Sequence, residues 1–200
     1  AQPLPSAEWT VLLELSDAES AEHARAVFEG LLEAGVERGC VQDAAIAQNI
    51  AQAKAFWHLR ESIPLAQAQA GLNIKHDISL PVSAIPGFVD EMEGLLARHL
   101  SGITVINFGH LGDGNLHYNV QAPEHGEPKA FLRDNEERIN ALVFDAVTRH
   151  GGSISAEHGI GSLKAATLPR YKSPVALALM RRIKAALDPD GLMNPGRVLA

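Results

Sequence analysis

The sequence is poor in cysteine and has no long apolar run. Cys40 is the only cysteine among 200 residues, which excludes an internal disulfide and a metal site built from several thiolates. We expect its side chain to be a small buried hydrophobe. No apolar stretch reaches the roughly 18 residues of a membrane-spanning helix, and the first residues lack the pattern of a secretory signal. Residues 1–8 have the composition of a linker.

The sequence also lacks an excess of basic charge. Lysine and arginine number 17 against 24 acidic residues, so the formal net charge is −7. No cluster of basic residues stands out, which disfavours nucleic acid as a partner. Because 46% of the residues are hydrophobic, the chain can fill the core of one large domain or of two small ones.

Two groups of enzyme motifs are absent. There is no Gly-x-Gly-x-x-Gly pattern that opens a helix and no Gly-Lys-Ser/Thr phosphate loop, so the sequence shows no nucleotide-binding motif. Ser153 and Ser155 lie near His158 along the chain. No nucleophile-elbow pattern surrounds these serines, which disfavours a serine hydrolase.

Hydrophobic periodicity predicts several strands and helices. Two-residue alternation predicts strands at residues 9–15, 41–46 and 74–81. Helical spacing predicts helices at residues 16–35, starting from a capping box at 16–19, and at residues 49–64, 83–96, 127–150 and 174–187. The last helix is expected to bury Ala176, Leu179, Met180, Ile183 and Leu187. This order of elements predicts an α+β fold, with a largely antiparallel sheet and helices packed on one face.

Residues 105–120 have the pattern of a β-hairpin that brings two histidines together. An apolar segment, a turn with Asp-Gly and Gly-Asn pairs, and a second alternating segment follow one another. His110 and His117 then lie on either side of the turn. Because side chains alternate along a strand, His117 and Asn119 face the same side. Asn115 is expected only to form the turn.

A second polar cluster, residues 153–161, contains Glu157 and His158. Two imidazoles and one carboxylate suit a divalent ion of the zinc class, and the same groups can serve in acid–base catalysis. A single histidine in a globular domain is more often a surface or core residue than a ligand. Four such residues in two glycine-flanked, non-helical segments are hard to explain by packing, so we predict a site that contains His110, His117, Glu157 and His158.

Two basic residues and the C-terminal tail leave alternatives open. Arg60 suits a carboxylate bound by two parallel hydrogen bonds, but a surface pair with a neighbouring glutamate explains it as well. Lys75, among isoleucines in a predicted strand, either extends into solvent or points into a polar cleft. Residues 188–197 are rich in turn formers. They fit either a helix stop with an ordered tail or a loop that lies against another domain or a cofactor.

Three segments, in this order, resemble one known family. Residues 108–117, 155–161 and 188–197 together resemble the C-terminal domain of FAD-linked oxidases of the vanillyl-alcohol oxidase type. The D-2-hydroxyglutarate and D-lactate dehydrogenases look like the most similar branch. The resemblance covers residues 9–200 and implies a ferredoxin-like substrate- and metal-binding domain. In that family an N-terminal FAD-binding domain, which this sequence does not contain, precedes it.

The resemblance implies a metal centre and a catalytic base. His110, His117 and Glu157 are similar to ligands of a divalent metal, usually zinc. His158 is similar to the base that removes the proton of the substrate hydroxyl. A 2-hydroxy acid that chelates the metal has a more acidic hydroxyl, and its Cα hydrogen then leaves as a hydride to the flavin.

The resemblance also implies residues that bind the substrate and the cofactor. Arg60 and Lys75 are similar to clamps for the substrate carboxylate, and Asn119 is similar to a further substrate contact. Asn194 in the tail is implied to contact FAD. The sequence departs from the pattern of the hydroxyglutarate-type members at Pro64, where these often have a hydroxyl residue, so the choice of 2-hydroxy acid stays open.

The resemblance therefore implies the substrate- and metal-binding half of an FAD-dependent D-2-hydroxyacid dehydrogenase, inactive when isolated because its electron acceptor lies in another domain. The expected partners are a small 2-hydroxy acid and the enzyme's own FAD-binding domain, in the cytoplasm or at the periphery of the inner membrane. A homodimer and a peripheral electron acceptor are compatible with the resemblance. Two alternatives remain: a metal-dependent hydrolase and a non-catalytic subunit that keeps the fold.

Overall fold

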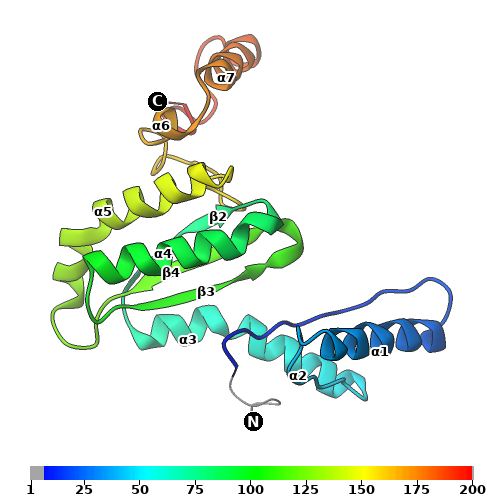
Figure 1. Ribbon diagram of the computed structural model, residues 1–200. Coiled ribbons are helices and arrows are strands. Elements are labelled where there is room, and N and C mark those ends of the chain that lie inside the picture. The colour runs from blue at the N-terminus through cyan, green and yellow to red at the C-terminus, as the bar shows by residue number, and fades with distance from the viewer. Residues whose placement is uncertain (1–6, 200) are drawn as a thin grey trace. The chain divides into compact units, whose positions relative to one another are not determined.

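The computed structural model describes residues 7–199 and contains helices and an antiparallel sheet (Figure 1). The chain divides into two compact units, Ala1–Gln67 and Ala68–Ala200. In the described part of the chain, no helix is long and apolar enough to cross a membrane. Residues 1–6 of the predicted linker lie outside the described residues.

Two helices of the first unit begin at polar capping residues. Before α1 (Ala21–Glu37), the Ser20 hydroxyl accepts a hydrogen bond of 3.0 Å from the N–H three residues on. Before α2 (Ile50–Glu61), the Asn49 side chain accepts one of 2.9 Å in the same way. These bonds satisfy N–H groups that have no partner within the helix. The capping box predicted at residues 16–19 is therefore wrong, because Ser20 performs this role.

Two predicted strands in the first unit are wrong. Residues 9–15 and 41–46 belong to no helix or strand. A strand needs a neighbour for its backbone N–H and C=O groups, and alternation in the sequence does not supply one. Trp9 and other apolar side chains of the first segment are exposed. The expected burial of Cys40 is wrong as well, since this residue is exposed.

A break at Pro64 separates α2 from α3 (Ile63–Ala70). Pro64 lies in the first turn of α3, where its missing N–H would have no helical partner anyway. The helix break predicted at this proline is confirmed. Arg60 lies in the last turn of α2.

The sheet of the second unit is centred on β4 (Asn115–Gln121). β3 (Thr104–His110) pairs with one edge of β4, which confirms the predicted hairpin. β1 (Asn73–Ile74) and β2 (Asp77–Ser79) pair one after the other with the opposite edge. These two short strands replace the single strand predicted at residues 74–81. All pairings are antiparallel.

The turn between β3 and β4 is built on η2 (Leu111–Asp113) and Gly114. Gly114 has a φ of 66°, in the left-handed region that favours glycine. A Cβ atom at this position would lie 1.9 Å from the carbonyl oxygen of Leu80. Only glycine therefore permits both the turn and its close approach to the end of β2.

Two long helices cover one face of the sheet (Figure 1). η1 (Val82–Ala84) leads into α4 (Ile85–His99), and α5 (Pro128–Arg149) follows the hairpin. Phe88 of α4 packs edge-to-face on Tyr118 of β4 at 5.4 Å between ring centroids. The core also includes other fully buried side chains of both helices and the sheet: Ile78, Met92, Val120, Ile139, Val143 and Val147. The α+β fold class with an antiparallel sheet is confirmed.

The ferredoxin-like topology is not confirmed. Such a fold has two β-α-β units and needs a further strand beside β2. Among the described residues only an isolated bridge between Ser79 and Ser153 lies there. The fold class is therefore stated as α+β.

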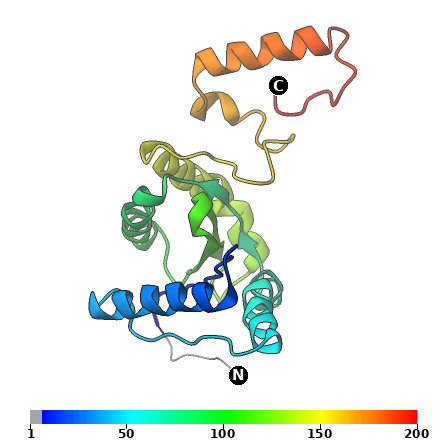
Figure 2. The ribbon, with the colours of Figure 1, turned by 90° about the vertical axis from the view of Figure 1, so that its right-hand side faces the viewer.

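α6 (Leu168–Tyr171) and α7 (Pro174–Leu187) follow α5 (Figure 2). As predicted, Ser173 caps α7, and its hydroxyl accepts a hydrogen bond from the N–H three residues on. Leu177 is the buried residue of α7. The expected burial of three other apolar side chains of this helix is wrong, since these are exposed: Leu179, Ile183 and Leu187.

His76, between β1 and β2, is a fully buried titratable group of the core. Its Nδ1 lies 2.7 Å from the carbonyl oxygen of Tyr118, and its Nε2 lies 2.9 Å from the side chain of Asn140 on α5. Burial lowers the pKa of His76 to about 4, against the opposing effect of these two hydrogen bonds. The core therefore holds this imidazole in its neutral form at pH 7.

We expect this buried imidazole to make the fold acid-sensitive. Because the folded-state pKa of His76 lies below the ordinary value, its stabilising effect is complete above about pH 6.5 and is lost as the pH falls towards 4. The loss at pH 4 should be about 3 kcal/mol. Urea unfolding between pH 7 and 4 measures it, with His76→Gln as the test variant and the exposed His125→Gln as the control. Equal pH slopes for the wild type and His76→Gln would contradict the account.

Candidate functional site

The face of the sheet opposite α4 and α5 carries polar side chains and is called the polar face below. Side chains alternate along a strand, so residues on either side of core-facing Tyr118 point away from the helices. Residues directly opposite each other in an antiparallel pair share one face. Asp77 lies opposite His117, and His110 lies opposite Asn115. The polar face of the hairpin and β2 thus includes Asp77, His110, Asn115, His117 and Asn119.

Asp77 of β2 is a buried carboxylate on this face. It accepts hydrogen bonds from the N–H of His158 at 2.9 Å, from the N–H of Glu157 at 3.2 Å and from the Ser155 hydroxyl at 3.2 Å. A buried carboxylate needs such donors because its desolvation costs several kcal/mol. Asp77 therefore fixes residues 155–158 against the sheet.

The same donors keep Asp77 ionised. Burial acts to raise the pKa of its carboxyl, but the N–H groups of His158 and Glu157, the His158 imidazole and the Ser155 hydroxyl act in the opposite direction. Together they hold the pKa of Asp77 below its usual range. The polar face therefore carries a fixed negative charge beside His158.

The segment that carries Glu157 and His158 is also tied to β2 at its start. Ser153 and Ser79 exchange two backbone hydrogen bonds of 2.8 and 3.0 Å. This approach needs glycine at position 152, because a Cβ there would lie 2.2 Å from the Ser79 carbonyl oxygen. The ammonium group of Lys164 donates to the Ile154 carbonyl at 2.7 Å. The start of the segment is thus held through the backbone of Ser153 and the carbonyl of Ile154.

Glu157 bonds to the hairpin through Asn115. The side-chain amide of Asn115 donates to Oε1 of Glu157 at 2.5 Å. Asn115 is buried and lies opposite His110, so this bond brings Glu157 to the strand pair that carries both hairpin histidines. The prediction that Asn115 only forms the turn is wrong, because it is the first residue of β4 and a partner of the predicted site.

The predicted metal ligands do not form a metal-binding group in the described part of the chain. Among residues 7–199, no group of three or more histidine, cysteine, aspartate or glutamate side chains could hold a metal ion. His110 is exposed, His117 is half-buried, and Glu157 is engaged by Asn115. The sequence predicted the types of the ligands. It did not predict that the amide of Asn115 would bond to Glu157. As these side chains lie, His110, His117 and Glu157 do not converge on one ion.

The ring of His158 lies beside Asp77 and His117. Its Nδ1 lies 3.4 Å from Oδ2 of Asp77, and its ring lies 6.1 Å from that of His117, with the two planes 30° apart. The ring centroid of His117 also lies 4.9 Å from that of Phe108. The His158 side chain is 69% exposed. A carboxylate beside one ring nitrogen orients the imidazole, so that its other nitrogen can meet a substrate.

Lys75 lies on the polar face. β1 and β2 pair with β4 in one common register, which places residue 75 opposite Asn119. The neighbouring His76 points into the core, so Lys75 points the other way. Lys75 is exposed, whereas Asn119 is buried and accepts a hydrogen bond of 3.1 Å from the His76 N–H. The substrate contacts predicted for Lys75 and Asn119 stay predictions.

Two predicted site residues belong to other parts of the chain. Arg60 lies in α2, in the first unit, and its role as a carboxylate clamp stays a prediction. Asn194 lies in the tail after α7, with a φ of 48° that asparagine tolerates better than most residues. It lines a pocket between α7 and the tail, and its contact with FAD stays a prediction.

Sequence reasoning missed the residues that assemble the site. Asp77 directly follows Lys75 and His76 in a predicted strand, so a local ion pair would explain it as well. The burial of its carboxylate, and hence its need for donors from residues 155–158, follows only from the fold. Ser155 and Asn115 carry no clear signal either, because serine and asparagine are ordinary loop residues.

Comparison with known proteins identifies a family for this chain. Residues 1–198 match the family model described as FAD linked oxidases, C-terminal domain. The chain is 40% identical over 198 residues to the mitochondrial D-2-hydroxyglutarate dehydrogenase of Arabidopsis thaliana, which covers 98% of this chain and 34% of that protein. It is 37% identical over 187 residues to the D-2-hydroxyglutarate dehydrogenase of Stutzerimonas stutzeri, which covers 94% and 39%, respectively.

A vertebrate relative gives the same result. The mitochondrial D-2-hydroxyglutarate dehydrogenase of Danio rerio is 36% identical over 199 residues, which amount to 98% of this chain and 35% of that protein. The chain thus spans about a third of the length of the curated relatives it matches. The matched region includes all three segments on which the resemblance was based.

We expect Asp77→Asn to loosen the segment at residues 155–158. An amide at this position loses the charge and replaces one acceptor oxygen by an NH₂ group that faces N–H donors. Each lost charged bond costs about 1.5–3 kcal/mol, so the free energy of unfolding should fall by about 2 kcal/mol or more. Hydrogen exchange of the Glu157 and His158 amides should accelerate. The control is Asp90→Asn, an exposed carboxylate of α4. Unchanged exchange in Asp77→Asn would contradict the role of this carboxylate.

Proposed function

Because the chain belongs to the family of FAD-linked oxidase C-terminal domains, we propose that it is the substrate-binding part of an enzyme that oxidises a D-2-hydroxy acid to the 2-oxo acid. The names of its relatives specify D-2-hydroxyglutarate as the substrate of those proteins. The chain covers about a third of their length, so the activity proposed is that of a longer enzyme.

The observation that carries the proposal is the exposed imidazole of His158 beside the buried carboxylate of Asp77. Nδ1 of His158 faces Asp77 at 3.4 Å, which leaves Nε2 as the atom that accepts the proton of the substrate hydroxyl. The negative charge of Asp77 stabilises the imidazolium that forms. The main-chain bond from His158 to the same carboxylate keeps the ring beside it during this step.

Oxidation of a 2-hydroxy acid removes a proton and a hydride. FAD, when it is bound by the rest of the enzyme, accepts the hydride from the Cα atom. The chain's own residues bind the acid and remove the proton. The orientation in which they hold the acid determines that the Cα hydrogen is the one that leaves. His158 takes the hydroxyl proton, so the oxygen can form the carbonyl of the 2-oxo acid.

Binding of the acid requires positive charge on the polar face. Lys75 is an exposed cation on this face, in the same register along β4 as Asp77. We propose that it binds a carboxylate of the substrate. Arg60, whose guanidinium can form two parallel bonds with a carboxylate, is proposed as the second clamp. Asn119 is proposed as a neutral contact that orients the acid.

A divalent ion is a separate part of the proposal. Two imidazoles and a carboxylate are a donor set that zinc accepts, and manganese, cobalt or iron(II) would accept it too. A bound ion would make the substrate hydroxyl more acidic. Glu157 bonds to Asn115 in the structure, and no three ligands converge among the described residues. No step of the reaction above depends on the ion.

Metal content tests this part directly. If His110, His117 and Glu157 bind the ion, equilibrium dialysis of the wild-type chain against zinc should give about one ion per chain. The variants His110→Ala, His117→Ala and Glu157→Ala should bind less, whereas the exposed His125→Ala, in another loop, should bind as the wild type does. A wild-type chain that binds no zinc at saturating concentration would contradict the proposed metal site. The proposed oxidation of 2-hydroxy acids would still stand.

Flavin reduction tests the proposed reaction. In a longer polypeptide that carries the flavin-binding part, D-2-hydroxyglutarate should bleach the flavin absorbance under anaerobic conditions. His158→Gln should slow this reduction by about 10²- to 10⁴-fold with unchanged flavin content, because the base is lost. His125→Gln is the control.

Two results would overturn the assignment. Flavin that no 2-hydroxy acid reduces would contradict the reaction. Full-speed reduction in His158→Gln would show that the base is a different residue. The 200-residue chain mixed with free FAD should give no turnover at a rate near that of the longer enzyme.

A further inference from the structure

α7 and the tail after it carry an apolar surface that no described residue covers. Along α7, apolar side chains recur every four residues and so form a stripe on one side of the helix. Their exposed fractions are 70% for Val175, 50% for Leu179, 60% for Ile183 and 72% for Leu187. Together with Leu192 and Met193 of the tail, which are exposed as well, they form what is called the α7–tail surface below.

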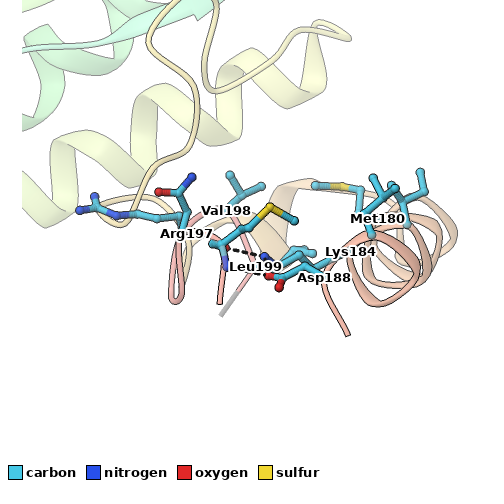
Figure 3. A pocket seen from close by; sticks show the side chains of 10 residues that line it. Met180, Lys184, Asp188, Arg197, Val198 and Leu199 are labelled. Carbon is cyan, nitrogen blue, oxygen red and sulfur yellow. Dashed lines mark hydrogen bonds and ion pairs between the residues drawn. The ribbon is translucent and has the colours of Figure 1, made fainter. Parts of the chain in front are cut away.

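The surface is hollowed by a pocket of about 390 Å³ between α7 and the tail (Figure 3). The tail is held in place by Asp188, whose buried carboxylate accepts hydrogen bonds from the N–H groups of Leu192 at 2.8 Å and Met193 at 2.9 Å. Lys184 of α7 forms an ion pair with Asp188 and donates to the Met193 carbonyl. The pocket is therefore part of an ordered surface and not a gap beside a loose end.

The tail is bonded to the segment that follows His158. The N–H of Val198 donates to the Gly161 carbonyl at 2.8 Å, and the guanidinium of Arg197 donates to the Ser162 hydroxyl at 2.8 Å. Val198 has a φ of 65°, in the left-handed region, where the backbone of a β-branched residue is strained. This strained residue lies where the tail is bonded to the segment that follows His158.

We propose that the α7–tail surface docks the flavin-binding domain of the same enzyme. The inference rests on the proposed function, which requires the flavin to lie within reach of the substrate at His158. The domain that holds the flavin must then border the segment of residues 157–162, to which the tail is bonded. Contiguous exposed apolar side chains mark a protein contact. The relatives are about three times as long as this chain, so they contain enough further polypeptide to form the partner surface.

Methionine oxidation provides the test, because the chain's three methionines have different surroundings. Met193 is 53% exposed on the α7–tail surface, Met180 lines the pocket, and Met92 is fully buried in the core. Peroxide oxidation followed by mass spectrometry should be about tenfold slower at Met193 in the longer, flavin-containing polypeptide than in the 200-residue chain, since the centre of a docked interface excludes solvent. Met92 should be resistant in both.

A matched pair of variants tests the stripe itself. In the longer polypeptide, Leu179→Glu combined with Ile183→Glu should restore fast oxidation of Met193. The control combines Ala178→Glu with Ala185→Glu, which adds the same charge to exposed positions on another side of α7 and should leave Met193 protected.

The outcomes separate docking from the proposed reaction. Equal oxidation of Met193 in the two polypeptides would overturn the docking proposal, even if the enzyme oxidises 2-hydroxy acids. Protection that appears in the 200-residue chain as its concentration rises would overturn it too, because a second copy would then be the occupant. A protected Met193 in an enzyme that oxidises no 2-hydroxy acid would support docking and refute the reaction.

Discussion

The geometry of the candidate site depends on the need of one buried carboxylate for hydrogen-bond donors. Asp77 lies on a strand, where its own backbone is used in pairing with β4. Its side chain therefore takes its donors from the main chain of Glu157 and His158 and from the hydroxyl of Ser155. Leaving the buried charge of Asp77 unpaired would cost far more free energy than ordering residues 155–158 does. The segment therefore has one favoured position against the sheet. Asp77 therefore joins the hairpin at residues 105–120, with which its strand pairs, to the polar cluster at residues 153–161.

The parts that the sequence predicts well are those determined by local chemistry. The glycine-rich turn defines the hairpin of β3 and β4, and Ser173 before a proline defines the start of α7. The strands expected at residues 9–15 and 41–46 fail because pairing is a property of two segments, which periodicity in one segment cannot supply. The types of the site residues were predictable, whereas the bond of Glu157 to Asn115 and the role of Asp77 depend on contacts between distant segments.

The second unit displays two features that make sense together in a larger enzyme. His158 presents a mostly exposed imidazole although its backbone is firmly held. The α7–tail surface presents apolar side chains although the tail is ordered by Asp188 and Lys184. A site that binds the acid and takes its proton needs a hydride acceptor close by. A domain that docked on the α7–tail surface would bring this acceptor to the segment that carries His158.

The rate of flavin reduction in Asp77→Asn tests the central claim most directly. The measurement uses the longer, flavin-containing polypeptide, saturating D-2-hydroxyglutarate and stopped-flow absorbance under anaerobic conditions. If Asp77 positions the catalytic segment and stabilises the imidazolium of His158, reduction should be slower by about tenfold or more at an unchanged flavin content. A rate equal to that of the wild type would show that this carboxylate holds the fold but has no part in the reaction.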